Sequence, residues 1–244
     1  MFKRLQNLVL AIALAFSFLA LTSHSALAAA TVSFDPESSL INASTIYETA
    51  NAGDRTQILN NVLISAEETL PQSKGFVNAT ILKGQDGAQL VVLSQWQDLA
   101  SYKAYETKRK ANPIEKKVAD SLKVRSYSYN NIRHIETRKG LPTLHERDRN
   151  VMFSEYFLRD PAKQSELLMV TEQFMPSVMS IKPGLQWVAL FPSTDKTTTA
   201  FVAQFDKPDD FKTLSQDAGF KDYAYWDAYA DNEHHLYDVV KIIS

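Results

Sequence analysis

Short stretches of alternating apolar and polar residues predict strands in the first half of the chain. The alternating stretches are residues 40–49, 76–82 and 125–132. Residues 90–93 are apolar on both faces, which is typical of a strand covered on both sides. Asp86-Gly87 lies between two of these stretches, and this dipeptide favours the tight turn of a β-hairpin. We therefore expect four strands, the middle two joined by a hairpin.

Apolar residues at spacings of three and four predict a helix between the first two strands. The apolar stripe consists of Ile58, Leu59, Val62, Ala66 and Leu70. Asp54 is a favourable N-cap, and Pro71 and Gly75 are typical helix stop signals. A second helix is expected after Gln97-Asp98, with a break and a new start at Asn112-Pro113.

The same order of elements recurs in the second half of the chain. A shift of 109 positions superposes glycine on glycine and aromatic on aromatic. The superposed pairs are Gly75 and Gly184, Trp96 and Phe205, Tyr47 and Tyr156, and Tyr102 and Phe211. Strands are expected over residues 151–158, 185–191, 198–205 and 237–243, and helices after Asp160-Pro161 and Lys207-Pro208, the last continuing through residues 223–235. Each half is thus predicted to be a β-α-β-β-α-β unit.

The N-terminus has the three parts of a secretory signal peptide. Lys3 and Arg4 precede an apolar run over residues 8–21, and small residues end the segment at Ala26-Leu27-Ala28. Cleavage is expected after Ala28, with Ala30 as the alternative. The apolar run is shorter than the roughly 20 residues that span a bilayer, so a membrane anchor is disfavoured. We expect a secreted or periplasmic protein, with no membrane association once the signal peptide is removed.

These patterns divide the chain into four segments. The segments are a signal peptide (residues 1–28), a first α+β unit (29–133), a charged linker (134–149) and a second α+β unit (150–244). A four-stranded sheet with helices on one face leaves its other face uncovered, and here the strands carry apolar residues on both faces. Packing the two sheets face to face solves this problem. The predicted fold class is α+β, with tandem ferredoxin-like units forming an intramolecular dimeric α+β barrel.

Several turn and packing positions resemble the antibiotic biosynthesis monooxygenase family of the dimeric α+β barrel superfamily. They are Lys74-Gly75 with the following hairpin, Leu93-Ser94-Gln95-Trp96, Leu99-Ala100-Ser101-Tyr102, Pro183-Gly184, Asp209-Asp210-Phe211 and Gly219-Phe220-Lys221-Asp222-Tyr223. The resemblance covers residues 40–243 and occurs in both halves. The family includes cofactor-independent monooxygenases of polycyclic phenols, haem-degrading enzymes and members without known activity.

The haem-degrading pattern of this family does not carry over to the chain. Glu115 and Ala224 occupy the positions where the resemblance would place a haem-ligating histidine. Haem iron requires imidazole or a comparable donor at that place. The resemblance therefore implies a protein that works without a cofactor.

Composition excludes several other classes of function. The formal net charge of -2 becomes -4 when Lys3 and Arg4 leave with the signal peptide, which disfavours a nucleic-acid partner. The chain has no cysteine, and it has neither a glycine-rich phosphate loop nor a Gly-x-Ser-x-Gly motif. His234 and His235 are expected at a helix end, pointing about 100° apart, so that helix capping or a surface position is favoured over metal binding. We expect no metal site.

Aromatic residues are the remaining candidates for a functional site. The candidate ligand-binding residues are Tyr47, Tyr156, Trp187, Tyr223 and Trp226, and the candidate catalytic residues are Asn78, Trp187 and Trp226. Core packing is the commoner role of such aromatics. Two hypotheses follow: an exported monooxygenase-like protein that oxidises or binds a small aromatic or lipophilic compound, or a non-catalytic exported protein that binds a small ligand or a partner. Function is expected where the two halves differ.

A single chain that contains both units is predicted to be a monomer. Sedimentation or scattering should therefore give the mass of one chain. A stable mass of two chains, whose dissociation also unfolds the protein, would contradict an internal pseudo-dimer.

Overall fold

The computed structural model describes residues 30–49, 53–129, 132–216 and 225–244. The first half contains β2 (Ile41–Glu48), α2 (Arg55–Thr69), β3 (Phe76–Gly84), β4 (Gln89–Trp96), α3 (Leu99–Ala111), α4 (Pro113–Ala119) and β5 (Val124–Tyr129). The second half contains β8 (Val151–Leu158), η1 (Pro161–Lys163), α5 (Gln164–Ile181), β9 (Leu185–Pro192), β10 (Thr198–Phe205), α6 (Pro208–Gln216), η2 (Tyr225–Ala228) and β11 (Ala230–Ile243). Short strands β1 (Thr31–Ser33), β6 (His134–Thr137) and β7 (Thr143–His145) complete the described elements.

Nine strands form one antiparallel sheet in the order β5-β2-β4-β3-β11-β8-β10-β9-β6. The two halves have the same internal strand order, β5-β2-β4-β3 and β11-β8-β10-β9. β11 joins them, because residues 230–237 pair with β8 and residues 237–243 pair with β3. The fold is therefore α+β with a curled antiparallel sheet.

The two terminal strands of the sheet, β5 and β6, are consecutive in the chain. β5 pairs with β2 and β6 pairs with β9, at opposite ends of the strand order. Tyr129 forms an isolated bridge with Ser193, and the Arg133 N–H donates to the Leu190 carbonyl at 2.9 Å. The end of β5 thus already lies against the segment that follows β9, as the curl of the sheet requires.

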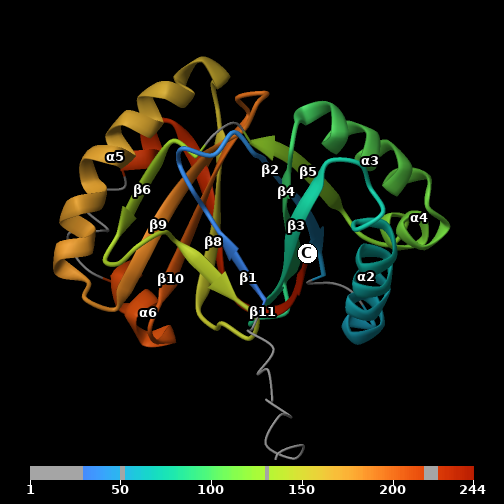
Figure 1. Cartoon of the computed structure of the whole chain (residues 1–244). Coiled ribbons are helices and arrows are strands. Elements are labelled where there is room, and N and C mark those ends of the chain that lie inside the picture. The colour runs from blue at the N-terminus through green and yellow to red at the C-terminus, as the bar shows by residue number, and fades with distance from the viewer. Residues whose placement is uncertain (1–29, 50–52, 130–131, 217–224) are drawn as a thin grey trace, which may run out of the picture.

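Helices cover the outer face of each half (Figure 1), with α2, α3 and α4 on one side of the molecule and α5 and α6 on the other. Side chains between helices and sheet form one outer cluster in each half, and side chains on the inner face form a third, inner cluster that draws on both halves. The largest members of the inner cluster are Phe34, Tyr129, Phe153, Trp187, Phe191 and Tyr237. The apolar residues on both strand faces are therefore buried, as the pattern predicted.

Residues 134–149, expected to be a linker, contribute strands and core residues. β6 extends the sheet, and β7 pairs with β1 in a separate two-stranded sheet. Val32 and Leu144 from this small sheet belong to the inner cluster, together with Phe34, whose ring lies 5.3 Å from that of Phe191. The small sheet therefore helps to bury the inner apolar face.

Helix starts agree with the sequence prediction, whereas the end of the chain does not. Asp54 and Asp98 cap α2 and α3 through Gln57 N (2.9 Å) and Ser101 N (2.7 Å). Residues 223–235 were expected to be helical, but η2 ends at Ala228 and β11 begins at Ala230. The prediction was wrong because cross-strand pairing with β8 outweighs the local helical spacing. No helix among the described residues is both long and apolar enough to cross a membrane.

Gly75 and Gly184 make the same contact in the two halves. A Cβ on Gly75 would lie 2.4 Å from Ser101 Oγ at the start of α3, and one on Gly184 would lie 2.1 Å from Asp210 Oδ2 at the start of α6. Gly75 also has a φ of +77°, a conformation that favours glycine. Glycine at this position allows the second helix of the unit to approach the first strand of the hairpin.

Replacement of Gly75 by alanine is expected to lower the free energy of unfolding by about 1–3 kcal/mol, because it adds backbone strain and a steric clash. Chemical denaturation measures this change. Gly53→Ala is the matched control: nothing lies within 4 Å of its Cβ, so a change within about 0.5 kcal/mol is expected. Equal effects of the two substitutions would contradict this explanation.

Candidate functional site

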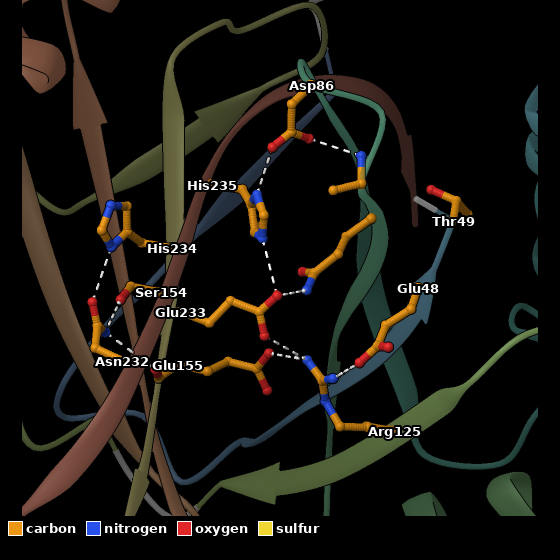
Figure 2. A network of polar contacts seen from close by, with 12 residues as sticks. Glu48, Thr49, Asp86, Arg125, Ser154, Glu155, Asn232, Glu233, His234 and His235 are labelled. Carbon is orange, nitrogen blue, oxygen red and sulfur yellow. Dashed lines mark hydrogen bonds and ion pairs between the residues drawn. The ribbon is translucent and has the colours of Figure 1, made fainter. Parts of the chain in front are cut away.

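β11 carries polar side chains on both of its faces. Successive side chains of a strand point to opposite faces, so Glu233 and His235 lie on one side of β11 and Asn232 and His234 on the other (Figure 2). Glu233 and His235 share the inner face with Tyr237, and Asn232 and His234 share the outer face with Leu236. His234 and His235 thus lie on opposite faces of a strand, not at a helix end. Two polar sites result, one on each side of β11.

The inner site is an ion-pair network around Arg125 of β5. Its guanidinium binds Glu48 of β2, Glu155 of β8 at 2.6 Å and Glu233 of β11 at 3.5 Å. Figure 2 shows the guanidinium between these carboxylates, which come from three different strands. Arg125 therefore links the last strand of the first half to two strands of the second half.

His235 extends this network toward the β3–β4 hairpin. Its Nδ1 lies 2.6 Å from Asp86 Oδ2, and its Nε2 lies 3.2 Å from Glu233 Oε1. Gln89 Nε2 also donates to Glu233, at 2.9 Å. Partial burial acts to raise the pKa of Asp86, but hydrogen bonds from the Ala88 N–H and from His235 outweigh it and lower this pKa. The network therefore favours ionised Asp86.

Glu155 is the buried carboxyl of the inner site. Its side chain is only 2% exposed, and Oε1 has no hydrogen-bond partner among the described residues. Burial raises the pKa of Glu155 above its ordinary value, although the attraction of Arg125 acts in the opposite direction. Burial prevails because one guanidinium is shared among three carboxylates.

The outer site is organised around Asn232. Its Nδ2 donates to Ser154 Oγ at 2.7 Å and to the Glu155 carbonyl at 3.1 Å. The carbonyl can only accept, so the amide orientation is determined and Oδ1 faces His234 Nδ1 at 2.9 Å. In neutral His234, Nδ1 must carry the proton. Nε2 then has a lone pair, and no hydrogen-bond partner for it occurs among the described residues.

His234 combines solvent access with a lowered pKa. Protein atoms around the ring desolvate it and lower its pKa, and the nearby charge of His235 adds to this shift. The Phe211 ring of α6 lies 5.4 Å from the imidazole. Tyr156 lies across from Asn232 on β8, with the Trp226 ring 6.0 Å away. The outer site thus places a neutral base beside aromatic side chains.

A buried polar cluster lies in the first half around Tyr47. Tyr47, which the shift of 109 positions superposes on Tyr156, donates to Glu115 Oε2 at 2.9 Å. Arg109 Nη1 donates to the same oxygen at 3.0 Å, and all three residues are buried. Burial raises the pKa of Tyr47, which therefore stays neutral. A buried ion pair thus lies beside Tyr47, whereas residues 218 and 224, which the same shift relates to this pair, lie outside the described residues.

The candidate residues predicted from sequence lie in three different places. Trp187 is buried in the inner cluster against Phe34, and Asn78 donates to Gln95 Oε1 at 2.8 Å. Tyr156 and Trp226 meet in the outer cluster of the second half. Tyr47 lies in the outer cluster of the first half. Tyr223 and Ala224 lie outside the described residues.

A groove of about 640 Å³ lies beside the start of α5. It is lined by Pro36, Ile132, Arg133, Gln164, Ser165, Leu168 and Pro192. None of the candidate aromatics is among these residues. In the described part of the chain, no group of three or more His, Asp or Glu side chains could hold a metal ion.

Sequence reasoning missed both polar sites of β11. His234 was predicted to lie on a helix. The contact between Arg125 and Glu155 inside the sheet depends on long-range strand pairing, which local patterns do not indicate. The shift of 109 positions relates Arg125, in a predicted strand, to His234. This relation was a signal that His234 lies on a strand.

Solved structures share this fold, although no protein-family model and no curated protein matches the sequence. An anthrone oxidase-like protein is 14% identical, with a TM-score of 0.70 over 87% of this chain and 95% of its own. A proposed monooxygenase from Fusobacterium nucleatum is 11% identical, with a TM-score of 0.54 over 85% and 95%. Chlorite dismutase from Candidatus Nitrospira defluvii, solved with imidazole, is 10% identical, with a TM-score of 0.54 over 83% and 92%. At these identities the similarity shows the fold.

Replacement of Glu155 by glutamine is expected to change how stability depends on pH. The pKa of Glu155 is higher in the folded protein than in the unfolded chain, where it is about 4.3. Glu155 therefore stabilises the folded protein below the unfolded pKa, and this stabilisation is lost as pH rises through the folded pKa. The variant should therefore match the wild type near pH 4 and become relatively more stable toward pH 8. Urea denaturation across this range measures the difference, and a constant difference would contradict the raised pKa.

Arg125→Gln tests the same network by removing its positive charge, and its effect should have the opposite dependence on pH. It leaves three carboxylates together without their shared guanidinium, so a loss of about 3–5 kcal/mol is expected at neutral pH. This loss should shrink as pH falls and the carboxylates take up protons.

Proposed function

We propose that this protein binds a small aromatic or lipophilic compound at the outer site of the second half and oxidises it with O₂ without a cofactor. One observation carries the proposal: His234 is an accessible imidazole with a lowered pKa, and Asn232 fixes its tautomer so that Nε2 can accept a proton. A base of this kind, next to aromatic side chains, suits the removal of a proton from a CH₂ group that an electron-rich phenolic ring system activates.

The proposed reaction begins with transfer of the substrate proton to His234 Nε2. The resulting anion gives electrons to O₂ and forms a carbon–oxygen bond. The peroxide anion then takes the proton back from His234, and loss of water from the peroxide yields a ketone. A substrate CH₂ group and O₂ thus become C=O and H₂O. Asn232 stabilises the imidazolium through Oδ1, because the Nδ1–H remains a donor to it.

Tyr156 and Trp226 provide the aromatic surface of this site. Their rings are 6.0 Å apart, and Trp226 is only partly buried. In this proposal Trp226 packs against the substrate, as its selection from sequence implied. Trp187 and Asn78, by contrast, face the inside of the sheet.

The proposed architecture is a tandem pair of units that closes an intramolecular barrel. It is supported by the identical strand orders, the matching Gly75 and Gly184 contacts, and the position of β5 and β6 at the two ends of the sheet. The proposed site of action is outside the cytoplasm. The N-terminal signal pattern and the absence of cysteine support this location.

A non-catalytic, ligand-binding role is the second candidate. Inside the curled sheet, Phe34 packs against Trp187 and Phe191, and these side chains occupy the space that a substrate would need there. The packed interior therefore favours a role without catalysis inside the sheet. In that case the outer site would bind a compound without turning it over. Binding without oxygen uptake would distinguish this role from catalysis.

Replacement of His234 by glutamine is expected to lower oxygen uptake with an anthrone substrate by about 10²–10⁴-fold, because the general base is lost. His145→Gln, an exposed position on β7, is the matched control and should retain the wild-type rate. The rate should fall with pH only below the ordinary histidine pKa of about 6.5, since the pKa of His234 is lowered. An unchanged rate in the His234 variant would rule out this role.

A further inference from the structure

The groove beside the start of α5 is separate from the outer site, since the two share no residue. Its volume, about 640 Å³, falls within the range of small-molecule sites. Gln164 lines it and is only 6% exposed. We propose that this groove is a second binding site, which takes a flat aromatic hydroxy acid.

Gln164 supplies an acceptor whose orientation is determined by the fold. Its Nε2 donates to the Ser193 carbonyl at 3.2 Å and to the Thr198 carbonyl at 3.0 Å. Backbone carbonyls only accept, so the amide cannot be flipped. Oε1 is left with no hydrogen-bond partner among the described residues. Gln164 lines the groove, so this oxygen can accept a hydrogen bond from a ligand hydroxyl.

Arg133 supplies the charge in the groove. Its Nε donates to Glu172 Oε1 at 3.0 Å, which holds the guanidinium on the α5 side of the groove. Nη1 and Nη2 have no hydrogen-bond partner within the described ranges. The side chain is 61% exposed, so these two nitrogens are accessible to a carboxylate. A planar guanidinium binds a carboxylate with defined geometry, so an anionic ligand is favoured over a neutral one.

Apolar residues line the rest of the groove. They are Pro36, Ile132, Leu168 and Pro192. Proline rings and branched aliphatic side chains offer surfaces on which a flat ring can pack. The lining therefore matches a ligand with an aromatic body, a hydroxyl donor for Gln164 and a carboxylate for Arg133.

Binding of hydroxynaphthoate to the full chain tests the proposal, with fluorescence titration as the readout. Ser165 is an exposed groove residue near the start of α5, so Ser165→Trp should fill the groove and raise Kd more than tenfold. Ser165→Ala is the matched control and should leave Kd unchanged. Thermal unfolding of both variants should show that they remain folded.

Two ligand analogues and two further variants complete the experiment. Methoxynaphthoate lacks the donor and should bind about two- to tenfold more weakly. Arg133→Gln should weaken hydroxynaphthoate but not its methyl ester, which has no charge. His234→Gln should leave binding unchanged, which separates this site from the site of the proposed oxidation.

Three results would overturn the proposal. They are the absence of binding to the wild type, equal affinity for the hydroxy and methoxy compounds, and loss of binding in the His234 variant with retention in Ser165→Trp. The last result would assign the compound to the outer site instead. Failure of oxygen uptake alone would overturn the proposed function and leave the groove unaffected.

Discussion

The inner face of the sheet carries large apolar side chains from both halves, and neither half can bury them alone. Phe153 and Trp187 come from the second half, whereas Ile46 and Tyr129 come from the first. Burial of this face brings the halves together and forces the sheet to curl, since flat sheets would leave the face in water.

Arg125 lies within this inner face. Its buried charge is tolerated because carboxylates from both halves surround it, so the ion pairs also specify how the halves align.

β11 explains why two polar sites lie back to back. The alternation of a strand separates neighbours in sequence, so Glu233 and His235 join a buried network while Asn232 and His234 reach the helix side. The inner network is constrained by charge on every side. Asn232 and His234 have fewer charged neighbours, and the Nε2 lone pair of His234 has no partner among the described residues. This difference in environment makes one histidine structural and the other a candidate base.

Much of the fold could be predicted from sequence because it depends on local patterns. Alternation indicated β2, β3 and β5, and Asp54 and Asp98 marked the starts of α2 and α3. The assignment failed at residues 230–235, where local spacing resembled a helix but pairing with β8 determined a strand. The candidate site depends on such long-range pairing. Trp226 and Tyr156 were selected as aromatics, whereas Asn232, His234 and Arg125 gain their roles only from partners distant in sequence.

The position of β11 in the sheet has a consequence for the order of folding. β3 and β8 do not pair with each other, because β11, which follows the other described strands in the chain, lies between them. During synthesis the first half therefore emerges with the open edge of β3 and an uncovered apolar face, and both stay uncovered until β11 has been made. Such intermediates are prone to aggregate and are suitable clients for chaperones. In the exported protein that we propose, this delay is useful, since a chain whose sheet is completed only by β11 remains unfolded for longer, and an unfolded chain is the form that can be exported.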